Sequence, residues 1–197
     1  RSGLTSLCDA LLALKNPIDL DLSRCGLSVN GVNPVAKAIS AGAAVEAVAI
    51  GANPIGSEGG AILLEAIKTS KLKTIDIGKP LPLHEPYESD TLDLSNTQMD
   101  PGHVLLLSWW LGTEFSATIA HLALGSNQIG DEAMISLLDV LKDIPLISFD
   151  ISNTNCGVST ATKLAELVSE ETKFRAALTE LDLRENEALD EVALAEL

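Results

Sequence analysis

The chain has 197 residues, of which 46% are hydrophobic but only 3% aromatic, so its core is expected to be aliphatic. A net charge of −15 argues against nucleic acid or an anionic membrane as a partner, because both would be repelled. No apolar run approaches the roughly 20 residues that cross a bilayer. Three widely spaced cysteines fit neither a disulfide framework nor a zinc site, and they favour a reducing, cytoplasmic location.

The chain opens on a helix-like stretch, residues 4–15, that has no strand before it. A phrase of alternating apolar residues then recurs, and its fullest copies are Val45 to Ile55, Ile119 to Ile129 and Leu146 to Cys156. Each copy predicts a short strand with one buried face, followed by a turn that carries Asn or Thr. With partial copies included, the leading strand residues are 20, 48, 75, 92, 122, 149 and 181. Residues 189–197 resemble the start of another helix.

Helices are predicted between the strands, most clearly over residues 56–70 and 130–144, where apolar residues recur at helical spacing. The strands that begin at residues 75 and 92 lie too close together for an intervening helix. The segment 79–90 between them contains three prolines, which rule out a regular helix. We therefore expect an extended loop there, an irregular turn at Pro80, and a hole on the outer side of the molecule.

The helix predicted over residues 101–112 contains both tryptophans of the chain and no lysine or arginine. Trp109 stands where the helix over residues 130–144 carries an acid. Two interpretations remain open. In the first, an exposed apolar patch docks a partner and consists of Leu105, Leu106 and Trp109. In the second, the preceding segment folds over this helix and covers it with Leu81, Leu83 and Tyr87.

The repeated phrases resemble a leucine-rich repeat of the ribonuclease-inhibitor type, and the resemblance covers essentially the whole chain. It implies an α/β fold: a right-handed solenoid, or horseshoe, of about seven coils, with a parallel sheet on the concave side and helices on the convex side. Residues 1–197 would form one domain, and its irregular short repeat, residues 75–91, would lack a helix. The Asn, Cys or Thr of each turn is expected to form a buried ladder between adjacent coils.

Strand positions that alternate with the core residues are expected to face the concave side. The central one is an aspartate in five copies, namely Asp21, Asp76, Asp93, Asp150 and Asp182. Together with His121 and Arg184 they would line an acidic trough that suits a basic peptide or domain. The alternative is that a Leu-Asp-Leu strand is simply common in this class of repeat.

Candidate catalytic and metal-binding motifs are weak. Residues 51–58 have glycines at phosphate-loop spacing, but Ser57 and Glu58 stand where Lys and Ser/Thr are required. Residues 84–90 contain His84 and three acids, for which a solvated loop is a simpler interpretation than a weak metal site. We therefore expect no enzymatic activity, no metal and no cofactor.

The leading interpretation is a non-enzymatic, cytoplasmic protein–protein interaction module or scaffold that binds a protein on its acidic concave face. One alternative is a regulator similar to the GTPase-activating proteins of the nuclear transport GTPase, which share this repeat type. Against it, Arg24, Arg175 and Arg184 match no functional motif of that family. Another alternative is a sensor repeat that belongs to a larger nucleotide-binding receptor.

Overall fold

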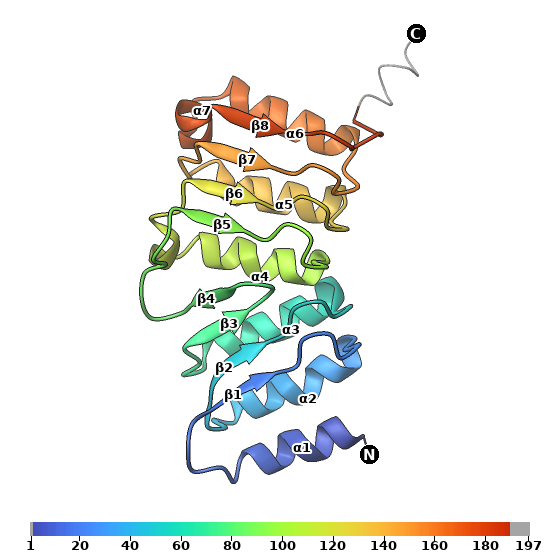
Figure 1. The fold of residues 1–197 in the computed structure, drawn as a ribbon, viewed down its shortest axis with the longest axis vertical. Coiled ribbons are helices and arrows are strands. Elements are labelled where there is room, and N and C mark those ends of the chain that lie inside the picture. Colours follow the sequence, from blue (N-terminus) through green and yellow to red (C-terminus); the bar gives the residue numbers. More distant parts are fainter. Residues whose placement is uncertain (1, 190–197) are drawn as a thin grey trace.

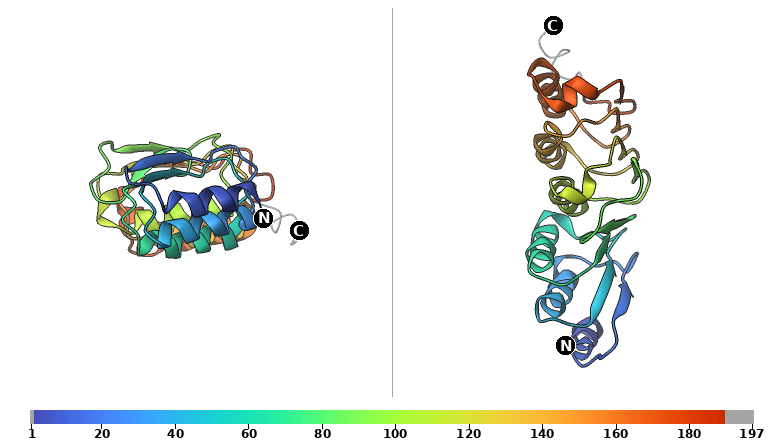
Figure 2. Two further views of the ribbon diagram at one scale, coloured as in Figure 1. Left: turned by 90° about the horizontal axis from the view of Figure 1, so that it is seen from below. Right: turned by 90° about the vertical axis from the view of Figure 1, so that its left-hand side faces the viewer.

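The computed structural model describes residues 2–189, in which strands and helices alternate along the chain. The strands lie along one side of an elongated molecule and the helices are stacked along the other (Figures 1 and 2). Each of the seven predicted leading strand residues lies inside a strand, so the predicted mixed α/β architecture is confirmed. The helix predicted over residues 189–197 lies, from residue 190 on, outside the described residues.

The strands are β1 (Ile18–Asp21), β2 (Val45–Ala49), β3 (Thr74–Asp76), β4 (Pro80–Pro82), β5 (Thr91–Asp93), β6 (His121–Ala123), β7 (Ser148–Asp150) and β8 (Glu180–Asp182). The helices are α1 (Gly3–Leu11), α2 (Val29–Ser40), α3 (Gly56–Lys68), α4 (Pro101–Leu111), the 3-10 helix η1 (Glu114–Ser116), α5 (Asp131–Leu141), α6 (Val158–Ser169) and α7 (Lys173–Ala177). The predicted helices over residues 56–70, 101–112 and 130–144 correspond to α3, α4 and α5.

The strands form two sheets in the described part of the chain, with the orders β1-β2-β3-β4 and β5-β6-β7-β8. All pairs within them are parallel except β3 with β4, which is antiparallel. Parallel strands joined through helices bury one face of each strand against the helix layer. The horseshoe curvature and the division into seven coils stay predictions.

The segment predicted as an extended loop over residues 79–90 contains the strand β4, which corrects that prediction. Ile75 pairs with Leu81 in the antiparallel register, and the Leu83 N–H donates to the Lys73 carbonyl at 2.8 Å. In this register the ring nitrogens of the two β4 prolines, residues 80 and 82, face away from β3. Because proline has no N–H to donate, a further strand cannot pair there and the sheet ends.

The outer helix layer has no gap where the short repeat omits its helix, so the predicted hole is wrong. Helix α4 packs directly against α3, and their backbones meet at two glycines. A Cβ atom placed on Gly60 would lie 2.6 Å from the carbonyl oxygen of Gly102. Because neither residue has a side chain, the two helices approach closely enough to close the layer.

Asp100 and His103, at the start of α4, bind this helix to the preceding coil. Asp100 Oδ2 accepts the Gly56 N–H at 2.8 Å, and Oδ1 accepts the Gly102 N–H at 2.9 Å. The fully buried His103 ring accepts the Asp100 N–H at Nδ1, so Nε2 donates to the Ile50 carbonyl, 3.0 Å away. These bonds connect the two halves of the molecule where no strand pairing joins them.

The Asp100 carboxylate makes the stability of this junction depend on pH. Burial raises its pKa, but the hydrogen bonds that the carboxylate accepts from the backbone N–H groups of Gly56 and His103 outweigh that effect and lower it. A lowered folded pKa contributes stability above the unfolded pKa of about 3.9, and that contribution is lost as the pH falls through the folded pKa. Urea titrations should therefore show Asp100→Asn less stable than wild type near neutral pH, with the difference shrinking below about pH 4. A difference that does not change with pH would contradict this assignment.

Candidate functional site

The outward-facing residues of β5 to β8 form two rows across the second sheet, a surface called here the strand face. In one row Asp93 pairs in register with Ala123, Ala123 with Asp150, and Asp150 with Asp182. The other row, also in register, consists of Thr91, His121, Ser148 and Glu180. Because neighbouring strands lie about 4.8 Å apart, Asp150 and Asp182 are direct neighbours, whereas Asp93 lies two strands from Asp150, across Ala123.

A hollow of about 230 Å³ opens on the strand face and is lined by residues of both rows. Ala123 presents only a methyl group between Asp93 and Asp150, so the surface is depressed at its centre. Leu122 and Phe149 also line the hollow, but their side chains are buried on the opposite side of the sheet, so the floor consists of strand backbone and the Ala123 methyl group. The acids around this floor, Asp93, Asp150, Glu180 and Asp182, make it a concave site for a positively charged group.

The structure separates the five predicted aspartates into two groups. Asp93, Asp150 and Asp182 share the strand face, whereas Asp21 and Asp76 lie on the first sheet. Ala49 stands in register between Asp21 and Asp76, and β4 follows β3 at the edge of that sheet. A single continuous acidic trough is therefore not formed by hydrogen-bonded strands.

The five aspartates also have a structural role that the sequence interpretation overlooked. Each side chain accepts a hydrogen bond of 2.8–3.1 Å from the backbone N–H two residues later. The donors are Ser23, Gly78, Ser95, Ser152 and Arg184. Such bonds close the turn that follows the strand, and the recurring Asp-x-Ser spacing is the sequence signal that reveals them. An asparagine keeps the accepting oxygen and removes the charge, which makes it the informative substitution.

Arg184 pairs with Asp182, the last residue of β8, which lies two positions before it. Its Nε donates to Asp182 Oδ1 at 2.9 Å and its terminal nitrogen to Oδ2 at 2.7 Å. These side-chain bonds, together with the Arg184 N–H, lower the pKa of Asp182. Arg184 therefore neutralises one acid of the strand face, and a partner would have to displace it to use either group. The carboxylates of Asp93, Asp150 and Glu180 have no ion pair among the described residues.

His121 lies at the centre of the strand face and contacts Ser148. Its Nδ1 atom is 2.8 Å from Ser148 Oγ, which fixes the orientation of the half-buried ring. The two residues come from paired strands, β6 and β7. They add hydrogen-bonding groups beside the acids, so the face offers hydrogen bonds as well as charge.

The predicted apolar patch on α4 is largely covered. Leu106 is only 1% exposed and is removed from the patch, because it points into the core. Leu105 and Trp109 are half-buried, and Trp109 packs against that core. They stay candidate surface residues.

Trp110, which the sequence interpretation did not single out, is the residue that the segment of residues 80–87 covers. Its Nε1 donates to the Pro82 carbonyl at 2.8 Å, and the Tyr87 ring meets its ring edge-on at a centroid distance of 5.7 Å. Leu81 and Leu83 of the same segment are buried. This arrangement agrees with the second sequence interpretation, in which the segment folds over the helix.

The two tryptophans should respond differently to acrylamide. The Trp109→Phe variant retains the fully buried Trp110, so its fluorescence should be quenched weakly. The Trp110→Phe variant retains the half-buried Trp109, so its Stern–Volmer slope should be severalfold larger. Equal slopes in two variants with native circular dichroism spectra would contradict the placement of α4.

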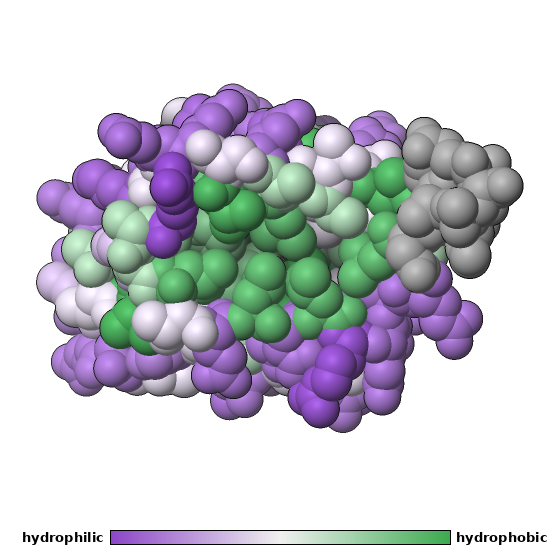
Figure 3. Space-filling model, turned by 90° about the horizontal axis from the view of Figure 1, so that it is seen from above, coloured by the Kyte–Doolittle hydropathy of each residue, from purple (hydrophilic) through white to green (hydrophobic). Residues whose placement is uncertain are grey.

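Apolar side chains also gather at the end of the molecule that carries α6 and β8 (Figure 3). Leu178, Leu181 and Leu183 are half-buried there, whereas the equivalent strand residues Phe149 and Ile151 are 1% and 0% exposed. Val168 of α6 adds a side chain that is 41% exposed. The sequence interpretation assigned no role to these residues, because their repeat pattern is the same as that of buried copies.

The described residues contain no group of three or more His, Cys, Asp or Glu side chains placed to hold a metal ion. Within residues 2–189, no helix has both the length and the apolar character that a membrane span requires. All three cysteines are free; Cys8 and Cys156 are buried, and burial raises the pKa of both thiols, while Cys25 is exposed.

Comparison with known proteins adds one finding. A family model described as Leucine Rich repeat matches residues 115–138, which span η1, β6 and most of α5. The match supports a leucine-rich repeat protein. It falls on the coil that supplies His121 and Ala123 to the strand face. No curated protein matches the chain.

Proposed function

We propose that this chain is a non-enzymatic protein-interaction module or scaffold whose strand face binds a basic segment of a partner protein. The observation that carries this proposal is the hollow of about 230 Å³ lined by acids from three strands. Leucine-rich repeat domains generally mediate protein–protein interaction, and the matched segment contributes the strand β6 to this face. The ribonuclease-inhibitor type and its solenoid shape belong to the same proposal.

The chemistry of the face favours Lys or Arg side chains on the partner. Asp93, Asp150 and Glu180 are not neutralised within the described residues, and the chain as a whole carries a charge of −15. An acidic concave surface attracts a basic partner over a distance, raises its association rate and makes binding sensitive to salt. The GTPase-activating alternative is disfavoured because Arg184, the arginine on this face, is already paired with Asp182.

The test is a pull-down with wild type and with a variant that combines Asp93→Asn, Asp150→Asn and Glu180→Gln. The two asparagines keep the turn-closing acceptor oxygens, so the variant should fold normally. A matched control neutralises three exposed acids outside the strands through Glu132→Gln, Asp143→Asn and Glu171→Gln. We expect a basic protein that binds wild type and the control at low salt, is released by moderate salt and is lost from the first variant. Equal retention by both variants would overturn the proposal.

A further inference from the structure

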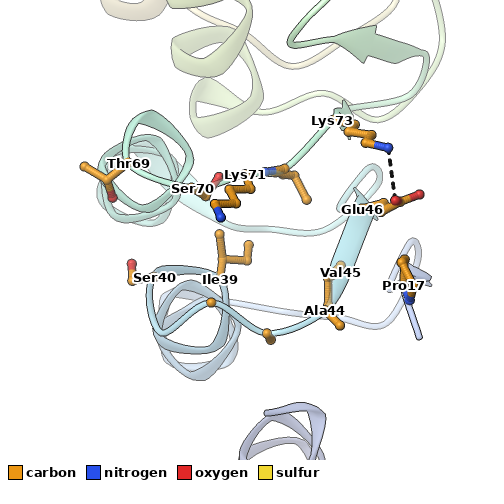
Figure 4. Close-up of a pocket in the computed structure, with 13 residues that line it drawn as sticks. Pro17, Ile39, Ser40, Ala44, Val45, Glu46, Thr69, Ser70, Lys71 and Lys73 are labelled. Carbon is orange, nitrogen blue, oxygen red and sulfur yellow. Dashed lines mark hydrogen bonds and ion pairs between the residues drawn. The ribbon is translucent and has the colours of Figure 1, made fainter. Parts of the chain in front are cut away.

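A second hollow, of about 460 Å³, lies between the connections that follow α2 and α3 (Figure 4), whereas the strand face belongs to the other sheet, β5 to β8. Its size falls within the range of about 300–1,000 Å³ that is typical of small-molecule sites. The walls are mainly apolar and are formed by Pro17, Ile39, Ala43, Val45 and Leu72.

The hollow exists because the connection after α2 is made of small residues. Residues 41–44 read Ala-Gly-Ala-Ala. The corresponding connections nearer the C-terminus place Phe115 and Phe174 against the core, and Phe174 is fully buried. With no large side chain in residues 41–44, the space beside Ile39 and Leu72 stays open.

Lys71 supplies the unneutralised charge of this hollow. Its side chain extends toward Ile39 (Figure 4), and it forms no ion pair or hydrogen bond among the described residues. The other charged residues of the lining, Lys73 and Glu46, pair with each other at 3.0 Å. A positive charge over apolar walls is unusual in a chain with a charge of −15.

The C-terminal ends of α2 and α3 also border the hollow, and unpaired helix carbonyls would repel an anion. Here the last carbonyls of α2 are paired: those of Lys37, Ala38 and Ile39 accept the N–H groups of residues 41, 43 and 42 at 2.9–3.2 Å. The Ile67 carbonyl of α3 accepts both the N–H and the hydroxyl of Ser70. Because these acceptors are satisfied, the charge of Lys71 dominates the hollow.

We propose that this hollow binds a small carboxylate with an apolar tail, the tail lying against Ile39, Val45 and Leu72 and the carboxylate pairing with Lys71. The ligand class follows from the lining, which offers an apolar surface and one free cationic donor. This site is independent of the strand face, and its occupant would be a small molecule rather than a protein.

The experiment is a titration of the ¹⁵N-labelled chain with octanoate, and with octylammonium as a probe of equal tail and opposite charge. We expect octanoate to shift the amides of residues 43–46 and 71–73 with a dissociation constant of about 1 mM or lower, and octylammonium to bind there more weakly. Lys71→Gln should weaken octanoate binding by about three- to tenfold. Lys68→Gln, a lysine of α3 outside the lining, should leave it unchanged.

A second variant tests the tail independently of the charge. Ala44→Leu places a larger side chain in the hollow and should abolish the octanoate shifts while the remaining spectrum stays native. The proposal is overturned if octylammonium binds as tightly as octanoate. The negative ends of the helix dipoles of α2 and α3 would then attract a cation at least as strongly as the charge of Lys71 attracts an anion. The proposal is also overturned if octanoate shifts only the amides of residues 178–183, or shifts no amide at all.

Discussion

Replacing Gly102 with alanine is expected to lower the free energy of unfolding by about 3 kcal/mol. A Cβ on Gly102 would overlap the Gly56 carbonyl oxygen and lie 2.6 Å from Ile55 Cγ1. The first of these is backbone, which cannot rotate away. Helices α3 and α4 would have to separate, and the Gly56 N–H bond to Asp100 would be strained or lost.

Urea denaturation followed by circular dichroism measures this effect, and Gly3→Ala is the matched control. Gly3 is also helical, but a Cβ placed there meets nothing within 4 Å. The control should therefore be neutral or slightly stabilising, because alanine is the better helix former. If Gly102→Ala behaved like Gly3→Ala, the close approach of α3 and α4 would be refuted. Such a result would restore the outer hole that the sequence predicted.

The repeated strands and helices could be predicted from the sequence because their information is local. Each strand region has alternating apolar residues, such as Leu122 in β6 and Leu124 directly after it, and both are buried. The helices have apolar residues at helical spacing. When one strand–helix unit stacks on the next, the apolar faces of the strands and of the helices are buried in the same way in every unit. Periodicity alone is sufficient for such an architecture.

The short repeat could not be predicted because its structure depends on contacts between segments. The prolines 80 and 82 exclude a helix, but whether they form a loop or a strand depends on the free edge of β3. The closure of the helix layer depends on Gly60 and Gly102, which are 42 positions apart and belong to different repeats. Trp110 rather than Trp109 is the covered residue because its ring N–H donates a hydrogen bond to the Pro82 carbonyl.

The aspartates of the candidate site were predicted as a row, and the register of β5 to β8 agrees with that row. Their second use, to close turns, was not recognised, although Ser95 and Ser152 follow Asp93 and Asp150 at the required spacing. One carboxylate oxygen is thus engaged by the fold while the charge remains at the surface. Stability and binding can be separated at these positions only by a substitution that keeps the oxygen.

Replacing Asn127 with alanine should lower the free energy of unfolding by about 3 kcal/mol. The side chain is 2% exposed, and its Oδ1 accepts the N–H groups of Thr97 and Met99 at 3.2 and 2.9 Å. Its Nδ2 donates to the carbonyls of Leu94 and Leu124 at 2.9 Å, and to a third carbonyl in the same turn. Alanine would leave these backbone groups buried without a partner. Gln128→Ala, at the exposed neighbouring position, should change stability by less than about 0.5 kcal/mol.

Asn127→Asp separates the loss of hydrogen bonds from the loss of volume, because the two side chains have nearly the same shape. At neutral pH the variant keeps the acceptor for Thr97 and Met99, but it loses the donor and buries a charge. Burial raises the pKa of such a carboxyl, so near pH 4 it binds a proton and regains one donor. We therefore expect Asn127→Asp to be at least as unstable as Asn127→Ala at neutral pH and to recover part of the difference in acid. If both variants melted like wild type, the buried amide would not be what joins this coil to its neighbour.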